Sequence, residues 1–275
     1  MVVQSNLASR GDGESGSVLI SNSPMSNSGW EKRTALVTGG ASGIGLATAE
    51  LIVRRGGNVV VVDLQEDAAA EAARNLGDTA VWLGGDVSTP ETCERMAAEA
   101  VACFGGLDAA VNCAGVNLGR GVKLADVPLD DYRRVMSVNL DGTFYSMRAE
   151  IATMLAVGRG GAIVNVGSVL SQVGRAGSAP YTASKHAILG LTRAAALEYG
   201  GDGIRVNCVG PGFIPTGLSG GASPDVAAEM VARHHAIPRA GRTEDVAEII
   251  CFLASPAAAL CTGGWYAVDA GWTAA

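Results

Sequence analysis

Two side chains that could carry out proton transfer lie four residues apart in this chain of 275 residues. Tyr181 and Lys185 belong to a segment whose composition predicts a helix from about Ala179 to Tyr199. A spacing of four residues places both side chains on one face of a helix, so their polar ends can meet. A tyrosine hydroxyl can give or take the proton of an alcohol, but an isolated pair of this kind is usually an exposed surface contact. The pair therefore indicates chemistry only if further functional residues lie beside it.

Two more polar residues are expected near the same place. Ser168 follows an apolar segment at 162–166, and Asn139 lies near the end of a helical segment at 131–140. In an open parallel sheet, ligands bind beside the carboxyl ends of the strands, so both residues could face one cleft. For Asn139, bending or capping of the helix is an equally compatible role.

A glycine-rich turn suggests a nucleotide-binding site. The residues TGGASGIG, with Gly39, Gly43 and Gly45, follow an apolar segment at 34–38 and precede a helical one. Glycine allows the tight turn and the close approach of backbone to a pyrophosphate, and the start of the helix offers free N–H groups to the anion. Because glycines also mark ordinary loops, the turn alone leaves the two interpretations evenly balanced.

Asp63 strengthens the nucleotide interpretation. It ends the segment NVVVVD, 18 positions after Gly45, close to the ~20-residue spacing of an acid that binds the adenosine ribose. A carboxylate there accepts hydrogen bonds from both ribose hydroxyls and repels a 2′-phosphate, and no Lys or Arg lies in the glycine turn or directly after Asp63. The sequence therefore favours NAD over NADP. A second role for Asp63, as N-cap of a helix starting at Gln65, is compatible with the first.

Seven short apolar segments are expected to form the strands that position these residues. They lie at 34–38, 58–63, 80–84, 109–112, 162–166, 204–209 and 265–268. Several are apolar at consecutive positions, as strands of a parallel sheet covered by helices on both faces must be. With right-handed crossovers, this pattern predicts an α/β fold: a doubly wound, Rossmann-type parallel seven-stranded sheet in a single domain.

Composition separates a tail from one folded domain and limits the partners. Residues 1–30 are rich in Ser, Gly and Asn, which predicts a disordered tail before a domain at 31–275. The formal net charge of -7 leaves no broad basic surface for nucleic acid. The six cysteines are scattered and predict reduced core thiols rather than a disulfide or metal framework. Without an apolar run of ~20 residues or a secretory signal, we expect a cytoplasmic protein that does not associate with membranes.

Taken together, the motifs resemble those of the short-chain dehydrogenase/reductase family. The family pattern TGxxxGxG stands at Thr38–Gly45, its Y-x-x-x-K at Tyr181–Lys185, and its preceding serine at Ser168. Its N-N-A-G motif is NCAG at Asn112–Gly115, in which Cys113 replaces an asparagine. The resemblance covers about residues 32–275 and implies an NAD-dependent oxidoreductase that is commonly a homotetramer.

The resemblance also implies roles for individual residues. Tyr181 is the general acid/base, and Ser168 orients the substrate oxygen. Lys185 holds the nicotinamide ribose, and Asn139 positions a water that connects Lys185 to solvent. The implied contacts with NAD are Gly39, Ser42, Gly43, Ile44, Gly45, Asp63, Leu64, Asp86, Val87, Asn112, Ala114, Gly115, Tyr181, Lys185, Pro211, Gly212, Ile214 and Thr216. No metal is expected.

The reaction depends on the pKa of Tyr181. A free tyrosine, with a pKa near 10, is a poor base near neutrality. We expect the Lys185 ammonium, with the positive nicotinamide ring, to lower the pKa of Tyr181 to ~7, a change that requires about 4 kcal/mol.

The expected lining of the substrate pocket is apolar. It consists of Val116, Leu118, Val169, Leu170, Val173, Phe213, Ile214 and Leu218. This lining predicts a hydrophobic secondary alcohol or ketone, cyclic or aryl-bearing, rather than a charged sugar phosphate. The loop at 213–238 is a candidate lid that excludes water. Two other functions stay open: an NAD-binding regulatory protein without turnover, and an epimerase or dehydratase that cycles NAD.

The histidines and the C-terminal tryptophans are expected to lie outside the chemistry. His186 follows Lys185 on the helix and points about 100° away from it, which predicts a surface or packing role. His234 and His235 are expected to form a solvent-facing pair. Trp265 and Trp272 are expected to serve in packing or subunit contacts.

Overall fold

One parallel sheet organises the protein. The computed structural model describes residues 29–219 and 223–274. The strands run in the order β3-β2-β1-β4-β5-β6-β7, and every neighbouring pair is parallel. They are β1 Thr34–Thr38, β2 Asn58–Asp63, β3 Ala80–Gly84, β4 Ala109–Asn112, β5 Gly161–Val166, β6 Ile204–Pro211 and β7 Trp265–Val268. The predicted doubly wound, Rossmann-type fold is confirmed.

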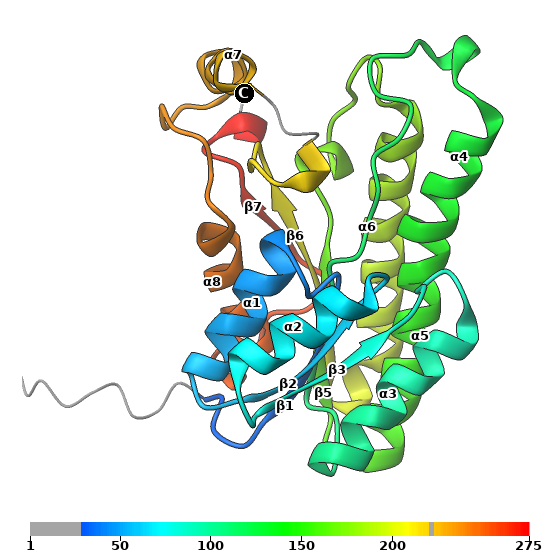
Figure 1. Ribbon diagram of the computed structural model, residues 1–275, viewed down its shortest axis with the longest axis vertical. Helices are drawn as coiled ribbons and strands as arrows, with labels where there is room; N and C mark the ends of the chain where they lie inside the picture. The colour runs from blue at the N-terminus through cyan, green and yellow to red at the C-terminus, as the bar shows by residue number, and fades with distance from the viewer. Residues whose placement is uncertain (1–28, 220–222, 275) are drawn as a thin grey trace, which may run out of the picture.

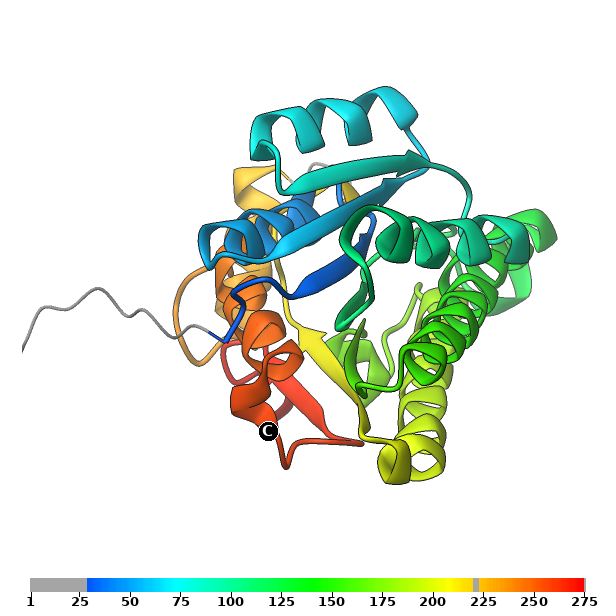
Figure 2. The same ribbon diagram turned by 90° about the horizontal axis from the view of Figure 1, so that it is seen from below.

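Helices cover both faces of this sheet (Figures 1 and 2). They are α1 Gly43–Arg54, α2 Glu66–Leu76, α3 Pro90–Phe104, α4 Leu129–Val135, α5 Gly142–Val157, α6 Ala179–Tyr199, α7 Pro224–His234 and α8 Thr243–Ala254. Helices α1, α2 and α8 pack against one face, and α3, α5 and α6 pack against the other. Helix α7 lies apart from both layers, near the carboxyl ends of β6 and β7 (Figure 1). Within the described ranges, no helix is long and apolar enough to cross a membrane.

The strands lie at the centre of the core because they are apolar on both faces. All five residues of β1 are buried. Along β2, Val59 and Val61 enter the core beneath α1 and α8, whereas Val60 and Val62 enter the core beneath α3 and α5. Side chains alternate between the two faces of a strand, so a strand buried on both faces is an unbroken apolar run.

Trp30 corrects the predicted boundary of the domain. Composition placed it in the tail at 1–30, but its side chain is 0% exposed and belongs to the core beneath α1 and α8. A methyl group added at Gly57, the residue before β2, would lie 3.2 Å from the Trp30 ring, so the backbone at this position packs closely on the indole. The burial depends on residues distant in the sequence, so local composition gives no sign of it. The rest of the predicted tail, residues 1–28, lies outside the described residues.

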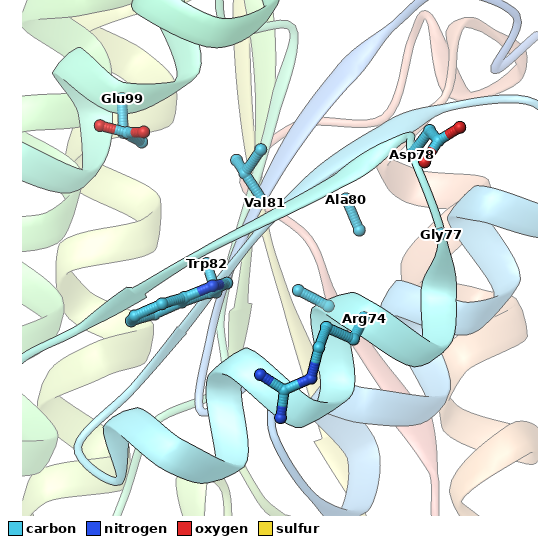
Figure 3. Close-up of a pocket in the computed structure, with 8 residues that line it drawn as sticks. Arg74, Gly77, Asp78, Ala80, Val81, Trp82 and Glu99 are labelled. Carbon is cyan, nitrogen blue, oxygen red and sulfur yellow. The ribbon is translucent and has the colours of Figure 1, made fainter.

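A hollow of about 500 Å³ lies at the β3 edge of the sheet. Its lining includes Arg74 and Asp78 at the end of α2, Trp82 on β3 and Glu99 on α3. Figure 3 shows Trp82 on the α2 side of the strand and Val81 on the opposite side. None of its lining residues belongs to the predicted chemistry, so this hollow is separate from the site described next.

Candidate active site

Tyr181 and Ser168 meet at the carboxyl end of β5. Tyr181 lies in the first turn of α6, next to Pro180, a residue that the start of a helix accepts readily. The Ser168 hydroxyl hydrogen-bonds with the Tyr181 side chain, and it accepts a hydrogen bond of 3.1 Å from the backbone N–H of Leu170. Both side chains are buried. The structure therefore brings together the two hydroxyl groups that the sequence placed 13 residues apart.

Apolar side chains surround the phenol of Tyr181. Val169, Leu170, Val173 and Trp272 pack against it in one cluster. Burial raises the pKa of Tyr181 to about 12, although the hydrogen bond with Ser168 acts in the opposite direction. The phenol is therefore protonated near neutral pH. The predicted value of ~7 includes the charge of the nicotinamide ring, so it stays a prediction for the enzyme with NAD bound. The protein's own groups act in the opposite direction, because removal from water outweighs the nearby charges.

Lys185 lies one helical turn beyond Tyr181, and it is also buried. Its Nζ atom lies 5.5 Å from the centre of the Tyr181 ring and donates a hydrogen bond of 2.7 Å to the backbone oxygen of Val166. Burial lowers the pKa of Lys185 to about 8. The ammonium group thus lies between the end of β5 and the phenol ring. The burial of both residues also excludes the interpretation of an exposed surface pair.

Asn139 connects the loop after β4 to helix α6. It lies in a π-helical segment, Met136–Asp141, between α4 and α5. Its Oδ1 accepts a hydrogen bond of 2.8 Å from the Val116 N–H, while its Nδ2 donates to the Val116 carbonyl and, at 3.1 Å, to the Ser184 hydroxyl. Ser184 precedes Lys185, so these bonds fix the β4 loop beside the catalytic turn of α6. Asn139 thus also lies at a local irregularity of the helix. π-Helical turns of this kind often occur at functional sites.

The glycine turn after β1 leaves no room for side chains. Gly39 and Gly43 have φ angles of 62° and 54°, in the left-handed region that favours glycine. A side chain at Gly39 would meet the backbone of Ala114 at 3.0 Å, and one at Gly45 would overlap the carbonyl of Gly39. The turn is therefore open to close approach by a ligand, and it lies at the start of α1.

Further residues at the same edge of the sheet fit a nicotinamide cofactor. A methyl group added at Gly43 would lie 3.4 Å from Thr216, and one added at Gly115 would lie 3.8 Å from Lys185 Nζ. Gly43 thus lies beside Thr216, and Gly115 lies beside Lys185; these four residues are called the cofactor cradle. The glycine turn would hold the pyrophosphate, while Lys185 and Thr216 would hold the nicotinamide half.

Two carboxylates lie where the adenosine half is expected. Asp63 accepts hydrogen bonds from the backbone N–H groups of Ala41, at 3.2 Å, and Gln65, at 3.1 Å. It therefore also supports the turn before α2. The N-cap of that helix is Gln65, so the second predicted role of Asp63, as the N-cap, is wrong. Asp86 forms an ion pair of 3.1 Å with Arg134. Burial alone would raise the pKa of Asp86, but hydrogen bonds from Ser88 and Arg134 hold it below the ordinary value.

The side chain of Asn112 points away from this cradle. Its Nδ2 donates to Glu150 at 3.1 Å and to Asn165 at 3.0 Å, and all three residues are buried. A contact of Asn112 with the cofactor would therefore come from its backbone. The other predicted cofactor contacts lie after β1, β2, β3 or β6 at the same edge: Ser42, Ile44, Leu64, Val87, Pro211, Gly212 and Ile214. Ile214 packs in the core with α8, which corrects its place in the expected substrate lining.

The expected lid at 213–238 contains helix α7, and the C-terminal segment packs against it. His234, at the end of α7, stacks on Trp272 with ring centres 4.1 Å apart and planes 5° apart. His235 lies with Nδ1 2.8 Å from the Arg239 carbonyl. Both histidines are half-buried, so the expectation of a solvent-facing pair is wrong. Trp272 also contacts the Tyr181 cluster, and this part of the cleft wall was missed because it joins distant segments.

Comparison with known proteins decides the family. A family model described as enoyl-(acyl carrier protein) reductase matches residues 39–273. The chain belongs to the short-chain dehydrogenase/reductase family. The cis-4-hydroxycyclohexanecarboxylate dehydrogenase of Sinomonas cyclohexanicum is 43% identical over 245 residues, which cover 88% of this chain and 97% of that protein. The cyclohexanol dehydrogenase of Acinetobacter sp. (strain SE19) is 41% identical over 256 residues, or 90% and 98% of the two chains.

A more distant relative has the same type of name. The 3-alpha-(or 20-beta)-hydroxysteroid dehydrogenase of Mycobacterium bovis is 35% identical over 240 residues, which cover 87% of this chain and 88% of that protein. The short-chain dehydrogenase/reductase described here is thus a nicotinamide-dependent oxidoreductase that acts on CH–OH groups, and the predicted enzyme class is confirmed.

Proposed function

We propose that this enzyme interconverts a hydrophobic cyclic secondary alcohol and its ketone with NAD(H). The observation that carries the proposal is the hydrogen-bonded pair of Ser168 and Tyr181, buried among apolar side chains. Apolar walls with a few convergent polar groups suit a ring that carries one hydroxyl. Relatives named for cyclohexanol, hydroxycyclohexanecarboxylate and hydroxysteroids support a ring-bearing substrate.

The residues divide the chemistry among them. NAD, when bound, accepts the hydride from the carbinol carbon. Ser168 and Tyr181 hydrogen-bond the substrate oxygen, and Tyr181 takes its proton during oxidation and returns it during reduction. Lys185, beneath the phenol ring, holds the nicotinamide ribose. Asn139 acts as a positioning residue, because its side chain binds Val116 and Ser184 rather than the reaction cleft.

Asp63 supports NAD rather than NADP as the cofactor. Its carboxylate already accepts two backbone N–H groups at the end of β2. A second anion, the 2′-phosphate of NADP, would be repelled there, whereas ribose hydroxyls can donate to the carboxylate. The residues directly after Asp63 are Leu64 and Gln65, neither of which offers a positive charge to a phosphate.

We further propose a homotetramer that pairs through α5 and α6. These helices belong to one layer and keep apolar side chains on the surface: Phe144 and Leu155 of α5 are exposed, and Leu197 of α6 is 87% exposed. Gly190 and Ala194 are exposed on α6 and would allow close approach of a second helix. Such exposed apolar positions favour a protein–protein contact.

The cysteines support the proposed location in the cytoplasm. All six are free, as expected for a reducing compartment. Cys103 corrects the expectation that they all fill the core, because it is exposed on α3 and bonds to Glu99.

Steady-state kinetics with cyclic alcohols and both cofactors would test the proposal. We expect turnover of cyclohexanol-type substrates, with kcat/KM at least about tenfold higher for NAD than for NADP. Tyr181→Phe should lower kcat by about 10²–10⁴-fold and leave the Kd for NADH within about twofold, since proton transfer contributes factors of that size. Tyr199→Phe, on the same helix, is the matched control. Full turnover by Tyr181→Phe would refute the assigned proton transfer.

A further inference from the structure

Two arginines on neighbouring loops reach to the segment after β6. Arg120 belongs to the loop after β4, and its Nη1 donates a hydrogen bond of 2.6 Å to the backbone carbonyl of Ser219. Arg175 belongs to the loop between β5 and α6, and its Nη2 lies 3.8 Å from the sulfur of Met230 in α7. Both side chains thus reach from the loops after β4 and β5 to the segment after β6.

The two arginine loops lie side by side. The backbone N–H of Gly121 donates a hydrogen bond of 2.8 Å to the carbonyl of Gly177, so the loops are joined next to each arginine. The charge of Arg120 acts on both Tyr181 and Arg175, and the charge of Arg175 acts on His234. Arg120 therefore lies within electrostatic range of Tyr181, and Arg175 lies within range of Arg120 and His234.

Neither arginine has an acidic partner among residues 29–219 and 223–274. The ion pairs of this part of the chain use other arginines, such as Arg134 with Asp86 and Arg233 with Glu229. Asp131 lies near the backbone of Gly119 but forms no ion pair with Arg120. Arg120 and Arg175, two like charges that repel each other, thus lie near the buried apolar cluster of Tyr181, in a protein whose formal net charge is -7.

The chemistry of this arrangement selects one kind of substrate. A guanidinium group offers parallel N–H donors that match the two oxygens of a carboxylate. Val169, Leu170 and Trp272, which pack beside Tyr181, are apolar, as the surroundings of a carbon ring would be. We infer that the substrate is a cyclic hydroxy acid whose hydroxyl lies at Tyr181 and whose carboxylate binds Arg120 and Arg175. This inference rests on the proposed function and refines the neutral alcohol expected from the sequence.

A comparison of an acid with its ester would test the inference. We would measure kcat/KM with NAD for 4-hydroxycyclohexanecarboxylate and for its methyl ester, in the wild type, Arg175→Gln and Arg120→Gln. Loss of either arginine removes a charge-assisted hydrogen bond to the acid. The ratio of kcat/KM for the acid to kcat/KM for the ester should therefore fall by about 10–100-fold, mainly through a higher KM for the acid. Arg175→Lys should recover part of the loss. Arg74→Gln, on α2 beside the distant hollow, is the matched control and should keep the wild-type ratio.

A binding measurement separates this inference from the proposed function. Cyclohexanecarboxylate, which has no hydroxyl to oxidise, should raise the Tm of the NAD-bound wild type but not that of Arg175→Gln. If Arg120→Gln does not fold because it loses its bond to Ser219, Arg175→Gln decides the outcome alone. An unchanged acid-to-ester ratio together with equal Tm shifts would overturn the carboxylate site, while turnover of the ester would leave the proposed function intact. Loss of turnover for all cyclic alcohols, with the Tm shift retained, would refute the proposed function and keep the anion site.

Discussion

Replacing Glu150 by glutamine should remove a pH-dependent loss of stability. Glu150 lies on α5 with 0% exposure, and its Oε2 accepts a hydrogen bond of 3.1 Å from Asn112. Burial raises the pKa of Glu150 from 4.5 to about 8, although the bond from Asn112 lowers it. At pH 6 the native protein therefore keeps this carboxyl protonated, whereas the unfolded chain has released the proton.

The size of the effect follows from the difference in bound protons. Between about pH 4.5 and pH 8 the native state binds one more proton than the unfolded state, so the free energy of unfolding falls as the pH rises. One proton corresponds to about 1.4 kcal/mol per pH unit, and the whole window to a loss on the order of 5 kcal/mol. Above pH 8 the native carboxyl also ionises, and the contribution becomes constant. Glutamine has a similar shape but cannot ionise.

Urea unfolding at pH 5, 7 and 9 would measure this difference. At pH 5 the variant should be within about 1–3 kcal/mol of the wild type, because the neutral acid and the amide make similar hydrogen bonds. At pH 9 it should have gained several kcal/mol relative to the wild type. Glu94→Gln, at an exposed residue of α3 that pairs with Arg148, is the matched control and should change little with pH. Parallel pH curves for the wild type and Glu150→Gln would refute the buried-acid interpretation.

Two further predictions concern the domain boundary and the catalytic phenol. Trp30→Ala should lower the free energy of unfolding by about 3–5 kcal/mol, because it empties a fully buried site; a change below about 1 kcal/mol in urea unfolding would show that Trp30 belongs to the tail after all. Since burial raises the pKa of Tyr181 to about 12, alcohol oxidation should become faster with rising pH, whereas a rate independent of pH between 6 and 9 would contradict proton removal by this phenol.

The fold could be predicted because each strand is marked locally. Val59 to Val62 form an unbroken apolar run, and a strand buried on both faces needs such a run. The glycine turn was equally clear, since Gly39, Gly43 and Gly45 are required by backbone angles and close contacts within a few residues. Trp30 was misplaced because its burial depends on α1 and α8, which no local pattern connects to it.

The site was predicted in its composition but not in its energetics. The sequence placed Ser168, Tyr181 and Lys185 together, but it gave no sign that burial raises the pKa of Tyr181 to about 12. The position of the Lys185 ammonium is set by the Val166 carbonyl, and the degree of burial is set by Trp272 from the far end of the chain. Both depend on tertiary contacts between different elements of the fold. The arginine pair was missed for the same reason, because the contact of Gly121 with Gly177 brings together loops that lie far apart in the sequence.

The apolar wall around Tyr181 has opposite effects on the two directions of the reaction. The wall excludes water and thereby strengthens the hydrogen bonds to the substrate oxygen. It also raises the pKa of the phenol, so that Tyr181 keeps the proton that ketone reduction consumes. Alcohol oxidation needs the phenolate and hence additional positive charge near the ring, of which Arg120 supplies a part. A substrate carboxylate bound to Arg120 would neutralise the positive charge that Arg120 supplies. We therefore expect a cyclic hydroxy acid to shift the pH dependence of oxidation to higher pH than its ester does, a shift that Arg120→Gln should abolish.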